Sequence, residues 1–240
     1  MDQYSLPPHV HYCLTEDGAV FLDLKRDVYL GVGIPVTRAL TAVVRGWPQT
    51  SSVARSAEPT PAEDVALIVD ALTRRGLLTQ HNGSGQPASP AILETPQLGM
   101  CDVDTIDWTD FRGSHAATFL SACASSAIRL RLLSLTRIVN RVTRRKCARA
   151  DLSSAFPIDF CRELTRSFLR LRALTYTARD ACLFDSLVLV EFLAHYRLFP
   201  TWIIGVTTGP FKAHSWVQHG HVVLNDTPER VRTYTPILTI

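Results

Sequence analysis

The sequence predicts an α+β protein that is built from two domains. Residues 9–32 alternate between apolar and polar positions, as half-buried strands do, and helical periodicity follows them. Residues 81–99, HNGSGQPASPAILETPQLG, are rich in Gly, Ser and Pro and are typical of a linker. We therefore expect an N-terminal domain over residues 1–82, a linker over 83–107 and a C-terminal domain over 108–240.

Composition narrows the class of protein. With 240 residues the chain is long enough for two small domains or one large one. The formal charge of +3 is too small to indicate nucleic-acid binding by itself. The six cysteines are scattered without a C-x-x-C pair, and no secretory signal, membrane span or Gly-rich nucleotide loop is found. We expect a cytoplasmic protein without a cofactor or a structural metal.

The N-terminal strands are predicted from alternation and from turn residues. Asp17-Gly18 separates the first two strands and Lys25-Arg26-Asp27 separates the second from the third, which predicts a three-stranded antiparallel meander. Pro35 then opens a helix that ends near Gly46. The segment Thr60-Pro61-Ala62-Glu63 is a capping box for another helix, and Gly76 is its stop signal.

The C-terminal domain begins with helical periodicity over residues 114–146 and again over 158–171. The first stretch is basic, and no Asp or Glu occurs between Arg112 and Ala150. Such a stretch is either a binding surface for an acidic partner or nucleic acid, or a solvated face whose apolar side points inward. The second interpretation is the more common one.

Cys182 lies at the start of a third predicted helix, with Asp180 as its N-cap. The free N–H groups and the dipole at a helix N-terminus favour a thiolate over a thiol. A strand over residues 201–206 follows, and then a hairpin that turns near His219-Gly220-His221.

His214 lies on one arm of this hairpin and Asp226 just beyond the other. Side chains alternate between the two faces of a strand, so these residues share a face only if the loop has an odd number of residues. A three-residue loop with Gly220 in or next to the left-handed position meets this requirement. The carboxylate would then orient the imidazole towards the thiol of Cys182, which is the arrangement of a nucleophilic triad.

The motifs around these residues resemble those of the lasso-peptide maturation protease, a leader peptidase with a transglutaminase-like fold. The resemblance covers residues 108–240, and its pieces include Ala181-Cys182-Leu183, Ile204-Gly205-Val206, Pro210-Phe211, Ala213-His214-Ser215-Trp216-Val217 and Asn225-Asp226. The chain departs from the family pattern at Ser215 and Gln218. The resemblance implies a transglutaminase-like or papain-like cysteine protease domain. It also implies a Cys182–His214–Asp226 triad that cuts the leader from a ribosomal precursor, and an asparagine-synthetase-like cyclase as partner.

The N-terminal domain resembles the peptide-binding RiPP recognition element, which has winged-helix character. This resemblance rests on the order of the elements and on Leu22-Asp23-Leu24 and Tyr29-Leu30. It implies that the leader peptide adds a strand to the exposed edge of the meander. The edge residues are Val28, Tyr29, Leu30 and Val32.

Other functions remain open from the sequence. The same triad could transfer the acyl group to an amine, as transglutaminases do. A non-catalytic winged-helix module that binds DNA is opposed by residues 1–80, which hold seven Lys or Arg against nine Asp or Glu. A metal hydrolase built from His214, His219 and His221 lacks a carboxylate pair that would complete the site. The sequence thus favours a cysteine peptidase that acts without metal, nucleic acid or membrane.

Overall fold

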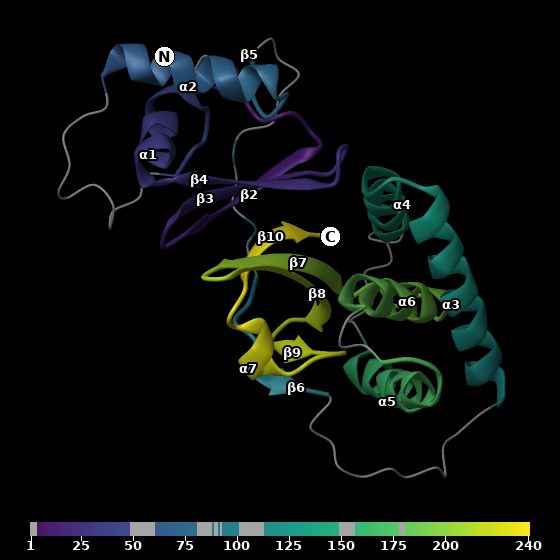
Figure 1. Ribbon diagram of the computed structural model, residues 1–240. Helices are drawn as coiled ribbons and strands as arrows, with labels where there is room; N and C mark the ends of the chain where they lie inside the picture. Colours follow the sequence, from purple (N-terminus) through teal and green to yellow (C-terminus); the bar gives the residue numbers. More distant parts are fainter. Residues whose placement is uncertain are drawn as a thin grey trace. The chain divides into compact units, whose positions relative to one another are not determined.

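The computed structural model describes residues 4–48, 61–80, 88, 91, 93–100, 113–148, 157–177 and 181–240. The chain divides into two compact units, Met1–Ala91 and Ile92–Ile240 (Figure 1). The helices in the described part are all too short or too polar to cross a membrane.

The N-terminal unit contains the antiparallel meander that the sequence predicts. Strands β2 (Val10–Thr15), β3 (Gly18–Asp23) and β4 (Val28–Gly33) pair in that order. Gly18 begins β3 with φ +141°, and a Cβ there would lie 2.1 Å from the Val32 carbonyl oxygen. Only glycine fits this close approach of two backbones. The central strand β3 is buried along its whole length, whereas β4 is half exposed.

One helix packs on this sheet, and a second helix packs on the first. Helix α1 (Ile34–Val43) begins one residue before the predicted Pro35, and α2 (Ala62–Arg74) is followed by Gly76 at φ +73°. The N–H groups of Gly76 and Leu77 donate to the carbonyls of Thr73 and Leu72, which is the Schellman pattern that a C-terminal glycine permits. Pro61 occupies the N-cap position of α2, while the predicted cap residue Thr60 lies outside the described residues.

An aromatic cluster fills the core between these helices and the meander. Tyr12 stacks on Trp47 at 4.3 Å between ring centroids, and Phe21 packs against both rings. A short strand pair, β1 (Tyr4–Ser5) with β5 (Thr79–Gln80), joins the two ends of the unit; the sequence pattern did not predict it.

A five-stranded sheet forms one layer of the C-terminal unit, in the order β10-β7-β8-β9-β6. Neighbouring strands run antiparallel except for β6, which pairs parallel with β9. The short helix α7 (Pro228–Val231) precedes the last strand. The strands are β6 (Leu98–Gly99), β7 (Thr201–Thr208), β8 (Phe211–His219), β9 (Val222–Val223) and β10 (Thr235–Thr239).

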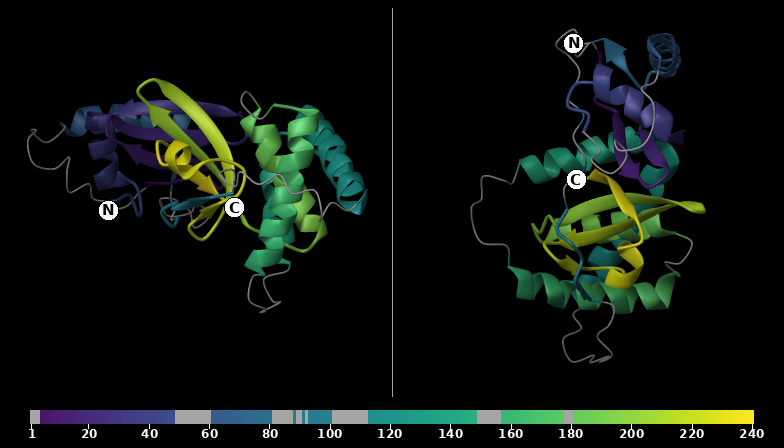
Figure 2. Two further views of the ribbon diagram at one scale, coloured as in Figure 1. Left: turned by 90° about the horizontal axis from the view of Figure 1, so that it is seen from below. Right: turned by 90° about the vertical axis from the view of Figure 1, so that its left-hand side faces the viewer.

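The four longer helices form the second layer and lie together on one side of this sheet (Figures 1 and 2). Helix α6 is buried at every position from Asp185 to Ala194, because it packs against β8 as well as against α3 and α5. Phe168 of α5 packs on Phe192 of α6 and on Phe119 of α3. The helices are α3 (Gly113–Leu132), α4 (Leu135–Cys147), α5 (Ile158–Thr175) and α6 (Cys182–His195).

Two features of this unit differ from the sequence prediction. The periodic stretch 114–146 forms two helices, because Ser134 takes an extended conformation between α3 and α4. Part of the predicted linker 83–107 also belongs to the C-terminal sheet. Its β6 pairs with β9, and the carbonyls of Glu94 and Pro96 accept hydrogen bonds from Gln218 and Arg232.

Candidate functional site

Cys182 is the first residue of α6 and is half-buried. The N-cap residue is Ala181, and no side chain caps the helix there. Asp180, the predicted N-cap, lies outside the described residues. The thiol therefore sits at the positive end of a buried helix, where backbone N–H groups are available to a negative charge.

His214 lies in the middle of β8, directly opposite Gly205 of β7. Its ring is 5% exposed and is flanked by the rings of Trp216, at 6.0 Å, and Tyr234, at 5.0 Å. A Cβ on Gly205 would lie 2.9 Å from the Trp216 ring and 3.0 Å from Tyr234. The glycine thus leaves the space in which the two aromatic rings hold the imidazole.

Asp226 contacts His214 directly, with 2.5 Å between Asp226 Oδ2 and His214 Nε2. The other carboxylate oxygen accepts a hydrogen bond from the Thr227 N–H at 2.8 Å. Arg230 approaches Oδ2 at 3.6 Å from the exposed side. Because Nε2 of His214 is hydrogen-bonded to Asp226, Nδ1 is the imidazole nitrogen that can interact with the Cys182 thiol.

The predicted three-residue hairpin loop is wrong. His219 pairs with Val222, so the loop contains only Gly220 and His221, with Gly220 in the left-handed conformation at φ +55°. In a regular ladder this register would place Asp226 on the opposite face from His214. Asp226 reaches the imidazole for another reason: the strand ends before it.

Asn225 ends the strand. The Leu224 N–H donates to the Val217 carbonyl, as in an antiparallel pair, but the Val217 N–H donates to Asn225 Oδ1 at 2.8 Å. A regular pair would direct this N–H to the Leu224 carbonyl instead. The Asn225 side chain therefore replaces a backbone acceptor. The chain leaves the sheet there, and Asp226 turns towards His214.

The surroundings of Cys182 and His214 shift their pKa values in opposite directions. Burial raises the pKa of the Cys182 thiol, but the hydrogen bond and charge of His214 and the N–H groups of Ser215 and Leu183 outweigh it, so the net pKa is lowered. Burial lowers the pKa of His214, but the hydrogen bonds and charges of Asp226 and Cys182 outweigh it, so the net pKa is raised. Both shifts favour a thiolate–imidazolium pair.

The carboxyl group of Asp226 is held in its ionised form. Burial raises its pKa, but the His214 hydrogen bond, the Thr227 N–H and the charge of Arg230 outweigh burial and lower it. A carboxylate beside an imidazolium stabilises the charged ring and fixes its orientation. The structure thus brings together the three residues that the sequence singled out, and the arrangement can support nucleophilic attack by sulfur.

Two residues that depart from the family pattern have structural partners. Ser215 Oγ lies 2.7 Å from Ser186 Oγ and 2.8 Å from the Trp202 indole nitrogen, so it ties β8 to α6 and β7. Gln218 donates to the carbonyls of Glu94 and Gly220. Their polar side chains are buried and satisfied. No pattern in the sequence signalled these contacts.

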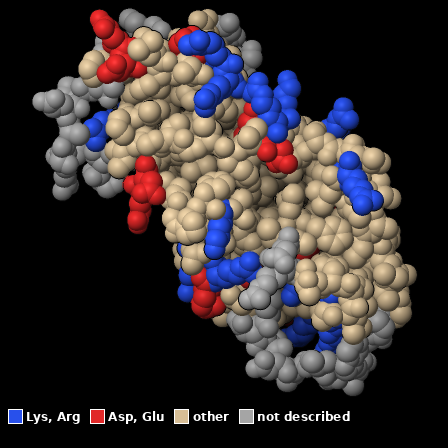
Figure 3. Space-filling view, viewed as in Figure 1, with Lys and Arg blue, Asp and Glu red and all other residues tan. Residues whose placement is uncertain are grey.

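The basic stretch is divided between buried ion pairs and solvent. Arg129 and Arg145 pair with the buried Glu191 of α6, at 2.6 Å and 2.5 Å. Helix α4 turns its apolar side inward and exposes other arginines. Lys and Arg occur in separate groups on the face shown in Figure 3. This arrangement agrees with the solvated-face interpretation. The buried apolar residues of α4 are Leu135, Ile138, Val139 and Val142.

The three histidines considered for a metal site have different surroundings. His214 is hydrogen-bonded to Asp226, while His219 ends β8 and His221 is exposed in the hairpin loop. Among the described residues, no three His, Cys, Asp or Glu side chains come together as metal ligands would.

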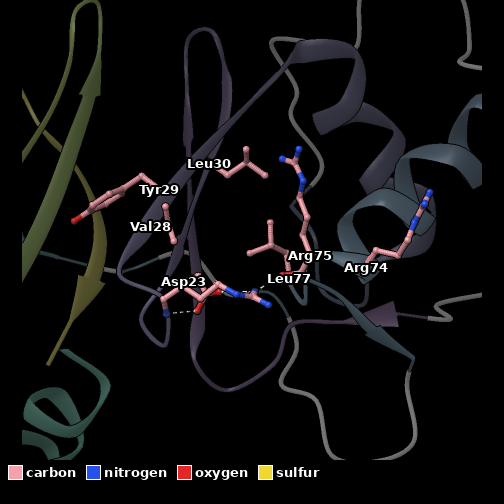
Figure 4. A pocket seen from close by; sticks show the side chains of 8 residues that line it. Asp23, Val28, Tyr29, Leu30, Arg74, Arg75 and Leu77 are labelled. Atoms are coloured by element: carbon pink, nitrogen blue, oxygen red, sulfur yellow. Dashed lines mark hydrogen bonds and ion pairs between the residues drawn. The ribbon is translucent and has the colours of Figure 1, made fainter. Parts of the chain in front are cut away.

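The N-terminal unit has a cavity of about 380 Å³ beside β4 (Figure 4). Val28, Tyr29 and Leu30 line it from the strand, whereas Val32 packs against the core of the unit instead. Below the strand, Arg26 pairs with Asp23 at 3.0 Å and also donates to the Arg75 carbonyl. The remaining lining comes from the end of α2 and the residues after it: Arg74, Arg75 and Leu77.

Comparison with known families identifies the C-terminal unit. Residues 121–239 match the family model of the transglutaminase-like superfamily, so this unit carries a transglutaminase-like domain. Such a domain has the fold of papain-like cysteine proteases and acyltransferases. The match contains Cys182, His214 and Asp226, and it does not reach the N-terminal unit. No curated protein and no solved structure gives a significant match to the chain.

Proposed function

We propose that the protein is a cysteine peptidase that removes the leader from a ribosomally made precursor in lasso-peptide biosynthesis. One observation carries the proposal: the Asp226–His214 contact of 2.5 Å beside a cysteine whose pKa is lowered by that same histidine. The transglutaminase-like domain supports the chemistry. The resemblance of the surrounding motifs to lasso-peptide leader peptidases supports the substrate.

In the proposed reaction the Cys182 thiolate attacks the carbonyl carbon of the scissile peptide bond. Backbone N–H groups at the start of α6 donate hydrogen bonds to the carbonyl oxygen as negative charge develops on it. His214 gives its proton to the leaving amine as the C–N bond breaks, which leaves a thioester on Cys182. His214 then takes a proton from water, which attacks the thioester and restores the thiolate. Asp226 holds the imidazole throughout.

The exposed edge of β4 is the proposed binding site for the leader. Within the described residues β4 pairs only with β3, so its outer edge offers backbone groups to an added strand. The cavity beside it offers apolar surface from Val28 and Leu30 next to the basic Arg74 and Arg75. An extended peptide with an apolar anchor and an acidic neighbour fits this combination.

Hydrolysis competes with acyl transfer at the same thioester, because either water or an amine can attack it. We favour hydrolysis, since the resemblance assigns ring closure to an asparagine-synthetase-like cyclase that uses ATP. Mass spectrometry of the products separates the two reactions. Hydrolysis gives a leader with a free carboxylate, whereas in acyl transfer an added amine attacks the thioester, displaces the Cys182 thiolate and gives an amide.

The central test uses Cys182→Ala and the precursor peptide of this protein. Wild-type protein should cleave the precursor, and the variant should not, because only the nucleophile is removed. Calorimetry should show that both proteins bind the leader with the same affinity, because the proposed leader-binding site lies in the N-terminal unit. Cleavage by purified Cys182→Ala protein would refute the cysteine mechanism. Loss of leader binding with retained folding would refute the separation of recognition from chemistry.

A further inference from the structure

A buried carboxylate, Asp185, lies one helical turn after Cys182 on α6. It is 1% exposed, and a buried charge is costly unless it is paired and hydrogen-bonded. Arg172 of α5 meets its Oδ2 at 3.1 Å, and the Tyr176 hydroxyl donates to its Oδ1 at 2.9 Å. The third partner is the amide of Asn225, which donates to Oδ2 at 2.8 Å.

Asn225 is held at three points by this arrangement. Its Nδ2 donates to Asp185, its Oδ1 accepts from the Val217 N–H, and its carbonyl accepts from Arg172 at 3.1 Å. These bonds fix both the side chain and the backbone of the residue directly before Asp226. A residue held in this way leaves the following residue little freedom of orientation.

We propose that Asp185 is a positioning residue, which acts through Asn225 to direct Asp226 at His214. This inference rests on the proposed role of Cys182 as nucleophile. The register argument carries it: the two-residue loop would place Asp226 on the wrong face, and the Asn225 bonds are what take the chain out of that register. Asp185 therefore links the helix that carries the nucleophile to the turn that carries the carboxylate.

The chemistry explains why this position holds a carboxylate. Arg172, Tyr176 and Asn225 all donate hydrogen bonds, and an ionised carboxylate only accepts. An asparagine at 185 would turn an N–H group towards some of these donors. The neighbouring Cys123 of α3 stays a neutral thiol, because burial and the charge of Asp185 raise its pKa to about 11.

Glu191 on the same helix provides a matched control. It is also a buried carboxylate that pairs with two arginines, Arg129 and Arg145. It differs from Asp185 in that its ion pairs go to α3 and α4 and not to the turn that carries Asp226. Glu191→Gln and Asp185→Asn both remove a buried charge from α6, so a general loss of stability should affect both proteins. Only Asp185→Asn should disturb the site.

The readout is the rate at which iodoacetamide alkylates Cys182 as a function of pH, followed by mass spectrometry of the peptide that contains it. This measurement uses the full chain and needs no substrate. In the wild type the midpoint should lie below that of an ordinary thiol, whose pKa is about 8.5. In Asp185→Asn we expect the midpoint to rise by about one unit, which is about a tenfold lower rate on the acidic side.

The sign of the shift separates positioning from a direct charge effect. Removing a negative charge near Cys182, and with it the ion-pair partner of Arg172, would by itself stabilise the thiolate and lower the midpoint. Loosening of Asp226 makes the imidazolium of His214 less stable, so the thiolate loses support and the pH midpoint of Cys182 alkylation rises. A higher alkylation midpoint in Asp185→Asn, with an unchanged midpoint in Glu191→Gln, supports the proposal. A lower midpoint in Asp185→Asn, or the same midpoint in both variants, overturns it.

Asn225→Ala tests the same link without removing the buried charge. It should raise the midpoint like Asp185→Asn, and the double variant should show no further rise, because both changes break one chain of contacts. If Asp185→Asn does not fold, an unchanged midpoint in Asn225→Ala still overturns the proposal. A wild-type midpoint at the value of a free thiol would refute the proposed function as well. A low wild-type midpoint that neither variant moves refutes only the positioning role.

Discussion

Under the proposed function, replacing Asp226 by asparagine should narrow the pH range of precursor cleavage. The competent form carries a thiolate on Cys182 and an imidazolium on His214. It forms as pH rises through the lowered pKa of Cys182 and is lost as pH rises through the raised pKa of His214. Asparagine keeps the shape of Asp226 but removes the charge that stabilises the imidazolium.

The expected shift of the pH profile follows from the strength of the Asp226–His214 contact. A hydrogen bond between charged partners contributes about 1.5–3 kcal/mol, and one pKa unit corresponds to about 1.4 kcal/mol. The Asp226–His214 pair is buried and 2.5 Å long, so little of its strength is screened by solvent. The upper limit of the activity profile should therefore fall by about 1–2 pH units. The lower limit should move less, because His214 is still protonated at that pH and the loss of a nearby negative charge does not disfavour the thiolate.

The assay is the pH dependence of kcat/KM for precursor cleavage, measured with wild-type and Asp226→Asn protein. Arg230→Gln serves as the control: its guanidinium lies 3.6 Å from Asp226 but its side chain is 44% exposed, so both limits should move only slightly. An Asp226→Asn profile with unchanged limits and unchanged height would refute the role of this carboxylate.

Two further predictions concern packing and recognition. Gly205→Ala should lower the free energy of unfolding, measured in urea, by about 1–3 kcal/mol, because the new Cβ would clash with the Trp216 indole ring. Gly31→Ala is the control, since open space surrounds its Cβ, and it should change the free energy of unfolding little. Equal effects of the two substitutions would contradict this packing. Tyr29→Pro and Leu30→Pro are matched test variants, since only one of two neighbouring N–H groups on an edge strand points outward. The variant that removes the outward N–H should weaken leader binding without loss of stability. Unchanged binding in both variants would exclude strand addition at β4.

Local signals predicted much of the fold. The meander was predicted from alternation with turn residues at Asp17-Gly18, and the end of α2 from Gly76, because these features depend on a few neighbouring residues. The helix that begins at Cys182 was predicted in the same way. The parallel pairing of β6 with β9 was not predicted. It joins segments more than a hundred residues apart, and a two-residue strand leaves no periodicity to detect.

The candidate site residues named from the sequence lie together in the structure, but by another route than the sequence suggested. The sequence named Cys182, His214 and Asp226, yet it derived their proximity from a hairpin loop of the wrong length. A loop of two residues and one of three differ by a single position, which strand patterns locate poorly. Asp185 was not recognised as a candidate, because an acidic residue in the first turn of a helix has an ordinary explanation in the helix dipole.

The lowered pKa of the Cys182 thiol depends on contacts that only the folded C-terminal unit provides. His214 comes from the centre of a sheet, Asp226 from the end of a strand, and Asn225 is held by residues of both α5 and α6. In the unfolded chain none of these contacts exists, so the thiol has an ordinary pKa and little thiolate at neutral pH. Reactivity therefore arises when the sheet packs on α6, and a variant that loosens this packing should lose thiolate character before it loses its helices.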